Sequence, residues 1–330
     1  MIIENIRLEL QNHVDKENVI KIWYIKEFLQ TIVLKQIYEL PMSKNLIFYG
    51  WTALRFIFGL NRLSEDLDFI WKWFVEFEEL WQSLQTFFWK ERLSVIYKIQ
   101  KFRVTLNFKN FLDNFGINYW NSRDLYIKIE ISDHIDFCKE FGTKLYPIFK
   151  FNQSLVLKSF DKSTLFSSKL NAVLHRNRKK QIWESLVSVK WRDIYDLFWY
   201  LSNGFTPNIH CIIWISDLQD LKIKLIAIIE NINFKDVCLD IENFVEDRSL
   251  LEFMKDNGKV RLLEKVKEMY KDLDVLVDYP YHSSIQTQLY GFSPGKSLQN
   301  NCYIMIKEKK YWNRRREIYK VQYINRCMFY

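Results

Sequence analysis

Glycine and proline are both scarce in this chain of 330 residues, which contains 8 Gly and 5 Pro. Average usage of about 7% would give roughly 23 glycines, and collagen-like or low-complexity chains are far richer in both residue types. Hydrophobic residues make up 48% of the chain and charged residues 27%, which excludes an intrinsically disordered protein. The sequence therefore indicates a globular protein that is long enough for two domains, each with its own core.

Long apolar runs and paired cysteines are also absent. No run approaches the roughly 18 residues that a membrane helix needs, and Glu4 and Arg7 interrupt the stretch where an export signal would be apolar. The cysteines are odd in number, widely spread and never arranged as Cys-x-x-Cys, so we expect reduced thiols and no zinc site. These features predict a cytoplasmic protein with no membrane partner. The cysteines are Cys138, Cys211, Cys238, Cys302 and Cys327.

Positive charge is concentrated at the C-terminal end of the chain. Residues 281–330 contain nine basic and two acidic residues, so they carry +7 of the net charge of +8. Aromatic residues lie among these cations, and such a segment can follow a phosphate backbone and stack on bases. The alternative is a solvated, poorly ordered terminus. The aromatic residues are Tyr303, Tyr311, Trp312, Tyr319 and Tyr323.

Apolar periodicity predicts an α/β half followed by a helical half. The spacing indicates a long helix over about 17–40, which Pro41 ends because proline cannot continue the backbone hydrogen-bond ladder. We expect a domain with a mixed sheet over 1–160, a helical domain over 161–280 and a basic tail over 281–330. The expected strands are 46–49, 66–70, 93–99, 102–108 and 125–131, and the other expected helices are 52–58, 75–89, 164–176, 193–202, 217–232 and 248–273.

Two aspartates lie on the predicted strand over 66–70. Alternate residues of a strand project from the same face, so Asp66 and Asp68 point the same way. Carboxylates this close repel each other and favour a divalent cation between them. Taken alone, such a pair is also typical of a solvated strand edge.

Residues near this pair extend the pattern. Gly50 lies in a predicted turn between a strand and a helix that begins near Thr52, and the free amides of a helix start can bind phosphate. Glu130 could add a third carboxylate to the cation site, or it could pair with Lys128 or with solvent. Together they suggest a site in which two hard cations and backbone amides hold a triphosphate. The cations would activate a hydroxyl and stabilise the leaving pyrophosphate.

The helical half contributes two further candidates. Lys169 lies at the edge of an apolar stripe, where its amine could reach this site or extend to solvent. Asp193 and Asp196 share one face of the predicted helix over 193–202. Asp193 is either a site residue or a helix N-cap, a role that aspartate fills well.

Four segments occur in a recognisable order along the chain. They are FYGWTALR (48–55), NRLSEDLDF (61–69), SKLNA (168–172) and RDIYDL (192–197). In order and approximate spacing they resemble the AbiEii/AbiGii toxin family, nucleotidyltransferase-fold proteins related to DNA polymerase beta and to the MenT toxins. The resemblance covers about 20–205. It implies an α/β (α+β) nucleotidyltransferase fold with a mixed sheet, followed by a mostly helical domain.

The resemblance also implies an activity and a set of site residues. Family members are toxins of toxin–antitoxin or phage-defence systems, usually paired with an AbiEi-like antitoxin, and the MenT relatives modify tRNA 3′ ends. We therefore expect transfer of NMP from an NTP to an RNA hydroxyl with two Mg²⁺, with tRNA as the acceptor only by analogy. The implied nucleotide-binding residues are Gly50, Trp51, Thr52, Arg55, Ser64 and Lys169; the metal ligands are Asp66, Asp68 and Glu130; and the catalytic residues are Asp66, Asp68, Lys169 and Asp193.

Two tryptophans depart from the family pattern. The family has Gly or Ser where this chain has Trp51, and typically Gly where it has Trp191. An indole at 51 is awkward where backbone must approach a phosphate closely. Because the chain has 12 Trp and only 8 Gly, we hypothesise that several tryptophans are mistranslated glycines from a gene that reads UGA as Gly. UGG codons at both positions would exclude this.

Two other functions remain open at this stage. If Trp51 is genuine, the chain could be an NTP-binding module on the same fold that performs no transfer. Alternatively, it could be a basic nucleic-acid-binding protein that acts through its C-terminal tail.

Overall fold

The computed structural model describes residues 2–71, 77–100, 102–117, 122–132, 137–175 and 191–269, together with the backbone of 304–313 and 316–325. Residues 1–278 form one compact unit, and residues 279–330 form a second. Among the described helices, none combines the length and the apolar character that crossing a membrane requires.

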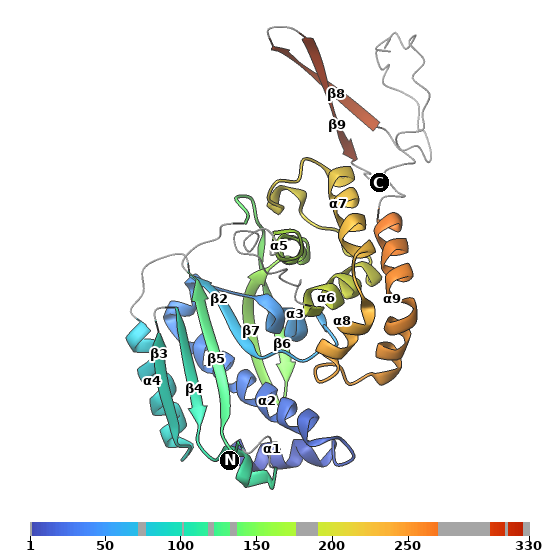
Figure 1. Cartoon of the computed structure of the whole chain (residues 1–330). Coiled ribbons are helices and arrows are strands. Elements are labelled where there is room, and N and C mark those ends of the chain that lie inside the picture. Colours follow the sequence, from blue (N-terminus) through green and yellow to red (C-terminus); the bar gives the residue numbers. More distant parts are fainter. Residues whose placement is uncertain are drawn as a thin grey trace, which may run out of the picture. The chain divides into compact units, whose positions relative to one another are not determined.

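A mixed seven-stranded sheet forms the centre of the first unit, in the order β3-β4-β5-β2-β1-β7-β6 (Figure 1). β2 pairs in parallel with β5 and β1 with β7, while the other neighbours are antiparallel. The predicted fold class is confirmed. The strands are β1 (Leu46–Tyr49), β2 (Asp66–Trp71), β3 (Val95–Gln100), β4 (Arg103–Phe108), β5 (Leu125–Ser132), β6 (Thr143–Lys150) and β7 (Gln153–Phe160).

β6 and β7 were not among the strands that the sequence pattern predicts. Every residue of β6 is at least partly exposed, so the strand has no buried apolar stripe, and Pro147 lies within it. Proline is tolerated in a sheet mainly on edge strands, and β6 is an edge strand. The domain expected over 1–160 therefore includes a hairpin that its apolar pattern did not reveal.

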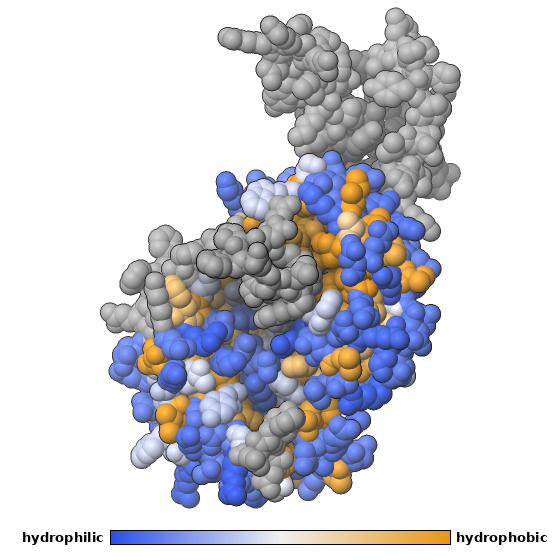
Figure 2. All heavy atoms as spheres, in the orientation of Figure 1, coloured by the Kyte–Doolittle hydropathy of each residue, from blue (hydrophilic) through white to orange (hydrophobic). Residues whose placement is uncertain are grey.

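Helices cover the sheet and build the second half of this unit. In the first half they are α1 (Ile2–Gln11), α2 (Asn18–Glu39), α3 (Gly50–Phe58) and α4 (Phe77–Lys90), with 3₁₀ turns η1 (Pro41–Asn45) and η2 (Phe111–Phe115). In the helical half they are α5 (Lys162–His175), α6 (Trp191–Ser202), η4 (Ile209–Cys211), α7 (Leu218–Glu230), α8 (Phe234–Ile241) and α9 (Arg248–Glu268). On the face shown in Figure 2, hydrophilic residues dominate and hydrophobic residues gather over the α6 and α7 region.

Two hydrophobic cores lie on opposite faces of the central strands. Leu67 and Phe69 of β2 are fully buried with α2 in one core, whereas Ile70 belongs to the core that α5–α9 build. Asp66 and Asp68 alternate with the first pair, so they project from the face that the helical half covers. The alternation predicted for 66–70 thus determines which side of the sheet carries the carboxylates.

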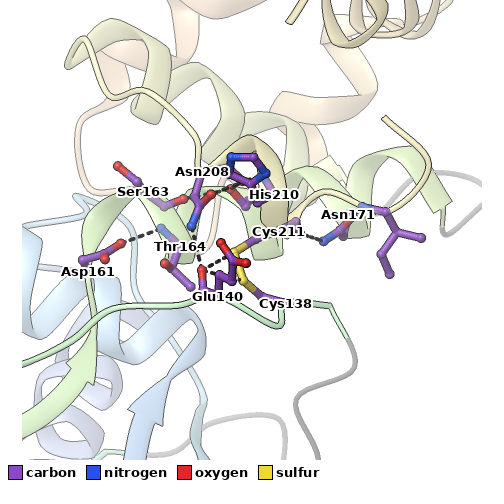
Figure 3. Close-up of a disulfide and its surroundings, with 11 residues drawn as sticks. Cys138, Glu140, Asp161, Ser163, Thr164, Asn171, Asn208, His210 and Cys211 are labelled. Carbon is purple, nitrogen blue, oxygen red and sulfur yellow. Dashed lines mark hydrogen bonds between the residues drawn. A yellow bond between two sulfur atoms is a disulfide. The ribbon is translucent and has the colours of Figure 1, made fainter. Parts of the chain in front are cut away.

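A disulfide joins Cys138, in the β5–β6 loop, to Cys211 in η4 (Figure 3). The expectation of reduced thiols is wrong for this pair. The two residues are 73 positions apart, and they meet only because the fold brings the loop and the 3₁₀ turn together. Cys238 is a buried free thiol, and Cys302 and Cys327 lie outside the described residues. Cysteine content therefore gives no indication of the compartment.

The segment around Cys211 packs along α5 (Figure 3). Asn171 donates from Nδ2 to the Cys211 carbonyl at 2.7 Å, and its Oδ1 accepts from the Ile213 amide at 2.8 Å. Ser167 donates to the Asn208 carbonyl at 2.7 Å. These bonds fix the helix that carries Lys169.

The second unit contains an antiparallel hairpin of β8 (Ile304–Asn313) and β9 (Arg316–Asn325). Two of the tail's lysines, Lys309 and Lys320, are directly paired in its register. Residues 304–325 of the predicted tail thus contain regular secondary structure, and residues 281–303 lie outside the described residues.

Candidate active site

The carboxylates of β2 lie beside the single carboxylate of the neighbouring strand β5. Parallel pairing places Asp68 next to Glu130 of β5, and Asp66 next to Lys128. Burial, together with the charges of Asp66 and Glu130, raises the pKa of Asp68 to about 7 against the opposing charge of Lys169. Burial likewise raises the pKa of Asp66. The sheet therefore gathers acidic groups whose ionised forms are poorly stabilised by the protein alone.

Gly50 lies directly against Asp68. A Cβ at this position would come within 2.0 Å of Asp68 Oδ2, and the φ of Gly50 is +76°, a region that L side chains rarely adopt. Only glycine allows the backbone of the β1–α3 turn to approach the carboxylate so closely. The first amides of α3 therefore begin beside Asp68, which is the arrangement that an anion bound next to a cation would need.

The donor set suits Mg²⁺. Asp66, Asp68 and Glu130 offer only oxygen ligands, and Asp66 Oδ1 is buried without a hydrogen bond. In this structure cations balance two of them: Lys128 Nζ lies 3.7 Å from Asp66 Oδ1, and Arg103 lies 2.5 Å from Glu130 Oε1. No compact group of three His, Cys, Asp or Glu residues occurs among the described residues, so the three carboxylates would have to draw together around a cation.

Lys169 and Trp51 meet at this site. The Lys169 ammonium lies 2.9 Å from the centroid of the Trp51 ring, and the guanidinium carbon of Arg62 lies 4.1 Å from it. Lys169 is 8% exposed, and it interacts electrostatically with Asp68 and Asp193. Trp51 thus contacts two cations at the start of the helix where a phosphate would bind.

Arg62 is held by a buried ion pair. Its Nε and Nη2 donate to the two carboxylate oxygens of Asp196 at 2.7 and 3.0 Å, and neither residue is more than 2% exposed. Burial raises the pKa of Asp196 to about 6, against the opposing charge of Arg62. Breaking such a pair on one side costs about 3–5 kcal/mol because the remaining charge is left buried. The pair connects α6 to the segment that leads into β2.

Comparison with known proteins identifies the family. The family described as nucleotidyl transferase AbiEii toxin of a type IV toxin–antitoxin system matches residues 32–262. The chain belongs to the AbiEii family.

Two solved structures from Helicobacter pylori are also similar to this AbiEii chain. JHP933 is 18% identical, with a TM-score of 0.46, and the match covers 79% of this chain and 96% of that one. A proposed nucleotidyltransferase is 19% identical, with a TM-score of 0.44, and its match covers 76% of this chain and 96% of that one. No curated protein matches the chain.

The structure brings most of the predicted AbiEii site residues together. Gly50, Trp51 and Asp68 are in contact or adjacent, and Lys169 is within electrostatic range of Asp68 and Asp193. Asp193 is fully buried and is the third residue of α6 rather than its N-cap. Asp66 lies two register positions from Asp68, on the same face of β2.

Three predicted nucleotide-binding residues have other partners in this structure. Arg55 forms an ion pair with Glu27 of α2, with Nε 2.5 Å from Oε1 and Nη2 3.0 Å from Oε2. Thr52 and Ser64 are buried and hydrogen-bonded to each other at 2.8 Å, and Thr52 also donates to the Asp66 carbonyl. Thr52 and Ser64 therefore brace the start of β2, and Arg55 anchors α3 to α2.

Sequence reasoning missed Arg62 as a site residue and did not assign Asp196 a role. Both belong to segments that carried the family resemblance, but a charged residue looks solvated in sequence unless its partner is known. The signal that could have found them is their position in the sequence. Arg62 lies four residues before Asp66, and Asp196 lies three residues after Asp193, so each is close to a candidate acid and the two could pair with each other.

The pKa of Lys169 predicts a pH dependence of nucleotide affinity. Burial lowers this pKa from 10.5 to about 8, while Asp196 and Asp193 act in the opposite direction. A triphosphate binds the protonated amine, so we expect NTP affinity to fall by up to about tenfold per pH unit above pH 8. Lys169→Arg should remove this fall because arginine stays charged.

Equilibrium binding of a non-hydrolysable NTP analogue between pH 7.5 and 9.5 measures this effect. Lys162→Arg, on the same helix, is the matched control and should keep the parent's pH profile. A profile that is flat in the parent chain, or that still falls in Lys169→Arg, would assign the titration to another group.

Proposed function

We propose that this AbiEii-family chain transfers NMP from an NTP to a hydroxyl of RNA, with Mg²⁺ bound and pyrophosphate released. One observation carries the proposal: the Asp68 carboxylate lies against the Gly50 turn, in electrostatic contact with Lys169. Phosphoryl transfer needs a carboxylate to hold a cation, backbone amides to bind phosphate and a positive charge near the phosphates, which the buried amine of Lys169 would supply. By analogy with the MenT toxins, the acceptor is a tRNA 3′ end, and the antitoxin is AbiEi-like.

The chain's own residues would divide the work. Asp66 and Asp68 would hold Mg²⁺, with Glu130 as a third ligand after it separates from Arg103. Bound Mg²⁺ would neutralise phosphate charge and make the acceptor hydroxyl easier to deprotonate. The amides at the start of α3 would bind phosphate oxygens, and Lys169 would balance the charge of the leaving pyrophosphate. Asp193 would keep Lys169 protonated and oriented.

Incubation of the full chain with labelled NTPs, total tRNA and Mg²⁺ tests the proposal. We expect labelled RNA and free pyrophosphate, and we expect neither after chelation with EDTA. Parallel reactions with each of the four NTPs identify the preferred nucleotide. Absence of labelled RNA from both the printed chain and its Trp51→Gly form would overturn the proposal.

A second candidate is an NTP-binding module that performs no transfer. The contact of Trp51 with both Lys169 and Arg62 favours it, because the indole engages cations that a triphosphate would use. Nucleotide binding by calorimetry without any product would select this reading.

A further inference from the structure

Four side chains form a cation–aromatic surface near Glu65 and Asp66. Trp23 and Phe244 have ring centroids 5.1 Å apart. The Lys26 ammonium lies 5.0 Å from the Trp23 ring centroid, and the guanidinium carbon of Arg192 lies 4.6 Å from that of Phe244. All four are partly exposed. We call Trp23, Lys26, Arg192 and Phe244 the 23–244 surface.

Three elements that are distant in sequence build this surface. Trp23 and Lys26 come from one face of α2, Arg192 from the start of α6, and Phe244 from the turn between α8 and α9 (Figure 1). Trp23 lies in the interior of α2, where a glycine would destabilise the helix by about 1 kcal/mol relative to a good helix former. The helix therefore does not favour glycine at position 23. Because its residues come from three separate elements, the surface forms only when the first unit is folded.

The surface is continuous with the segment that ends at Asp66. The Leu63 amide donates to the Phe244 carbonyl at 2.8 Å, and Arg192 lies 3.4 Å from a Glu65 carboxylate oxygen. Burial lowers the pKa of Lys26, and the charges of Glu65 and Asp66 act against that change. Lys26 is thus within electrostatic range of the first catalytic carboxylate.

The chemistry of the surface matches one kind of acceptor. Aromatic faces stack on bases of any sequence, at about 1–3 kcal/mol per base, and neighbouring cations follow the phosphates. Arginine can stack on aromatic faces and is favoured for the recognition of phosphates and nucleic acids. A duplex hides its base faces, whereas an unpaired end can lay them on the rings. Glu65 already pairs with Arg192, so stacking carries more of the binding than charge.

We propose that the 23–244 surface docks the single-stranded 3′ end of the acceptor polynucleotide, with its last bases on Trp23 and Phe244 and its phosphates near Lys26 and Arg192. This inference rests on the proposed function, and it adds where the acceptor binds. The terminal hydroxyl of such a strand would lie beside Asp66, while the NTP enters from the Gly50 side.

The test measures acceptor binding and NTP binding separately in the full chain. A fluorescent single-stranded RNA dodecamer with a free 3′ hydroxyl is titrated by anisotropy, and NTP binding is followed by calorimetry. We expect Trp23→Ala and Phe244→Ala each to weaken RNA binding by roughly tenfold, about the value of one stacked base. NTP affinity should stay within about twofold of the parent, and the KM for the RNA acceptor should rise.

Matched controls separate docking from folding. Trp89 is 76% exposed on α4, and Trp89→Ala should change neither measurement. Trp23→Phe keeps a stacking face, so it should retain most of the RNA affinity that Trp23→Ala loses. A duplex RNA of the same length should bind more weakly than the single strand.

Each outcome decides a different claim. If the alanine variants bind the dodecamer as tightly as the parent, the docking inference is wrong. If the same variants still label RNA with an unchanged KM, the transferase proposal stands. If RNA and NTP affinities fall together, the surface supports folding rather than docking, and the inference is also wrong. If the parent binds RNA but neither the parent nor its Trp51→Gly form labels it, the proposed transfer fails while the docking result stands.

Discussion

Asp68→Asn is expected to lower nucleotide transfer by roughly a thousandfold or more, which corresponds to about 4 kcal/mol of transition-state stabilisation. The amide has the same size as the carboxylate, so the close packing against Gly50 is kept. It carries no negative charge, so beside Asp66 and Glu130 it would hold a divalent cation much less tightly. Initial rates of label transfer to RNA at saturating Mg²⁺ measure the loss.

Asp113→Asn is the matched control for this change. Asp113 is an exposed acid that pairs with Arg123 at 3.5 Å on the surface, and its substitution should leave the rate unchanged. A rate for Asp68→Asn within tenfold of the parent would show that the chemistry does not depend on this carboxylate.

The same substitution should stabilise the metal-free fold. The pKa of Asp68 is raised from 3.8 to about 7 in the folded chain. Between these two pH values the folded state keeps a proton on Asp68 that the unfolded state has already lost. Stability of the parent therefore falls as the pH rises from about 4 to about 7, and it stays lower above that range. Asn avoids the loss, so in EDTA the variant should melt above the parent at pH 8, and the difference should vanish near pH 4.

The parts of the site that sequence predicted are those with a strong local pattern. The β1–turn–α3 unit follows from a short apolar run, Gly50 and a helical stretch, and the structure places it against Asp68. Strict alternation in β2 put Asp66 and Asp68 on one face, because Leu67 and Phe69 must enter the core. These features depend on neighbours in sequence, so they could be derived without the fold.

The parts that sequence did not predict depend on distant pairings. Arg62 acquires its role only through Asp196, 134 residues later, and the Cys138–Cys211 disulfide likewise joins separate segments. Arg55 lies within the family-like segment, yet its side chain pairs with Glu27 of α2. A family motif therefore pointed to the candidate site, but it did not show which polar side chains form ion pairs and hydrogen bonds around it.

Another tryptophan bears on the glycine hypothesis. Trp214 has a φ of +57° and is 68% exposed. A bulky residue in this left-handed region costs about 1–2 kcal/mol, whereas glycine adopts it freely. Its conformation is thus the one expected of a glycine position, so the codon at 214 belongs with those at 51 and 191 in the same sequencing test.

Trp51→Gly is expected to raise NTP affinity by roughly ten- to a hundredfold. In the chain with Trp51 we expect weak NTP binding, because the triphosphate must displace the indole from Lys169 and Arg62. A desolvated cation–π contact is worth about 2 kcal/mol, and each 1.4 kcal/mol recovered is a factor of about ten in affinity. Glycine also lets the amides at the start of α3 approach the phosphates closely. Calorimetry with an NTP analogue and Mg²⁺ measures the change.

The same variant should lose stability while it gains affinity, and this opposition makes the test specific. Trp51 packs against the core of the helical half, so its removal should cost about 1–3 kcal/mol in unfolding free energy. Trp214→Gly is the matched control: it makes the same exchange away from the site, so it should leave NTP affinity unchanged and should not destabilise the fold. Tight NTP binding by the chain with Trp51 in place would show that the indole moves aside at little cost. In that case the cation contacts of Trp51 would not govern nucleotide entry.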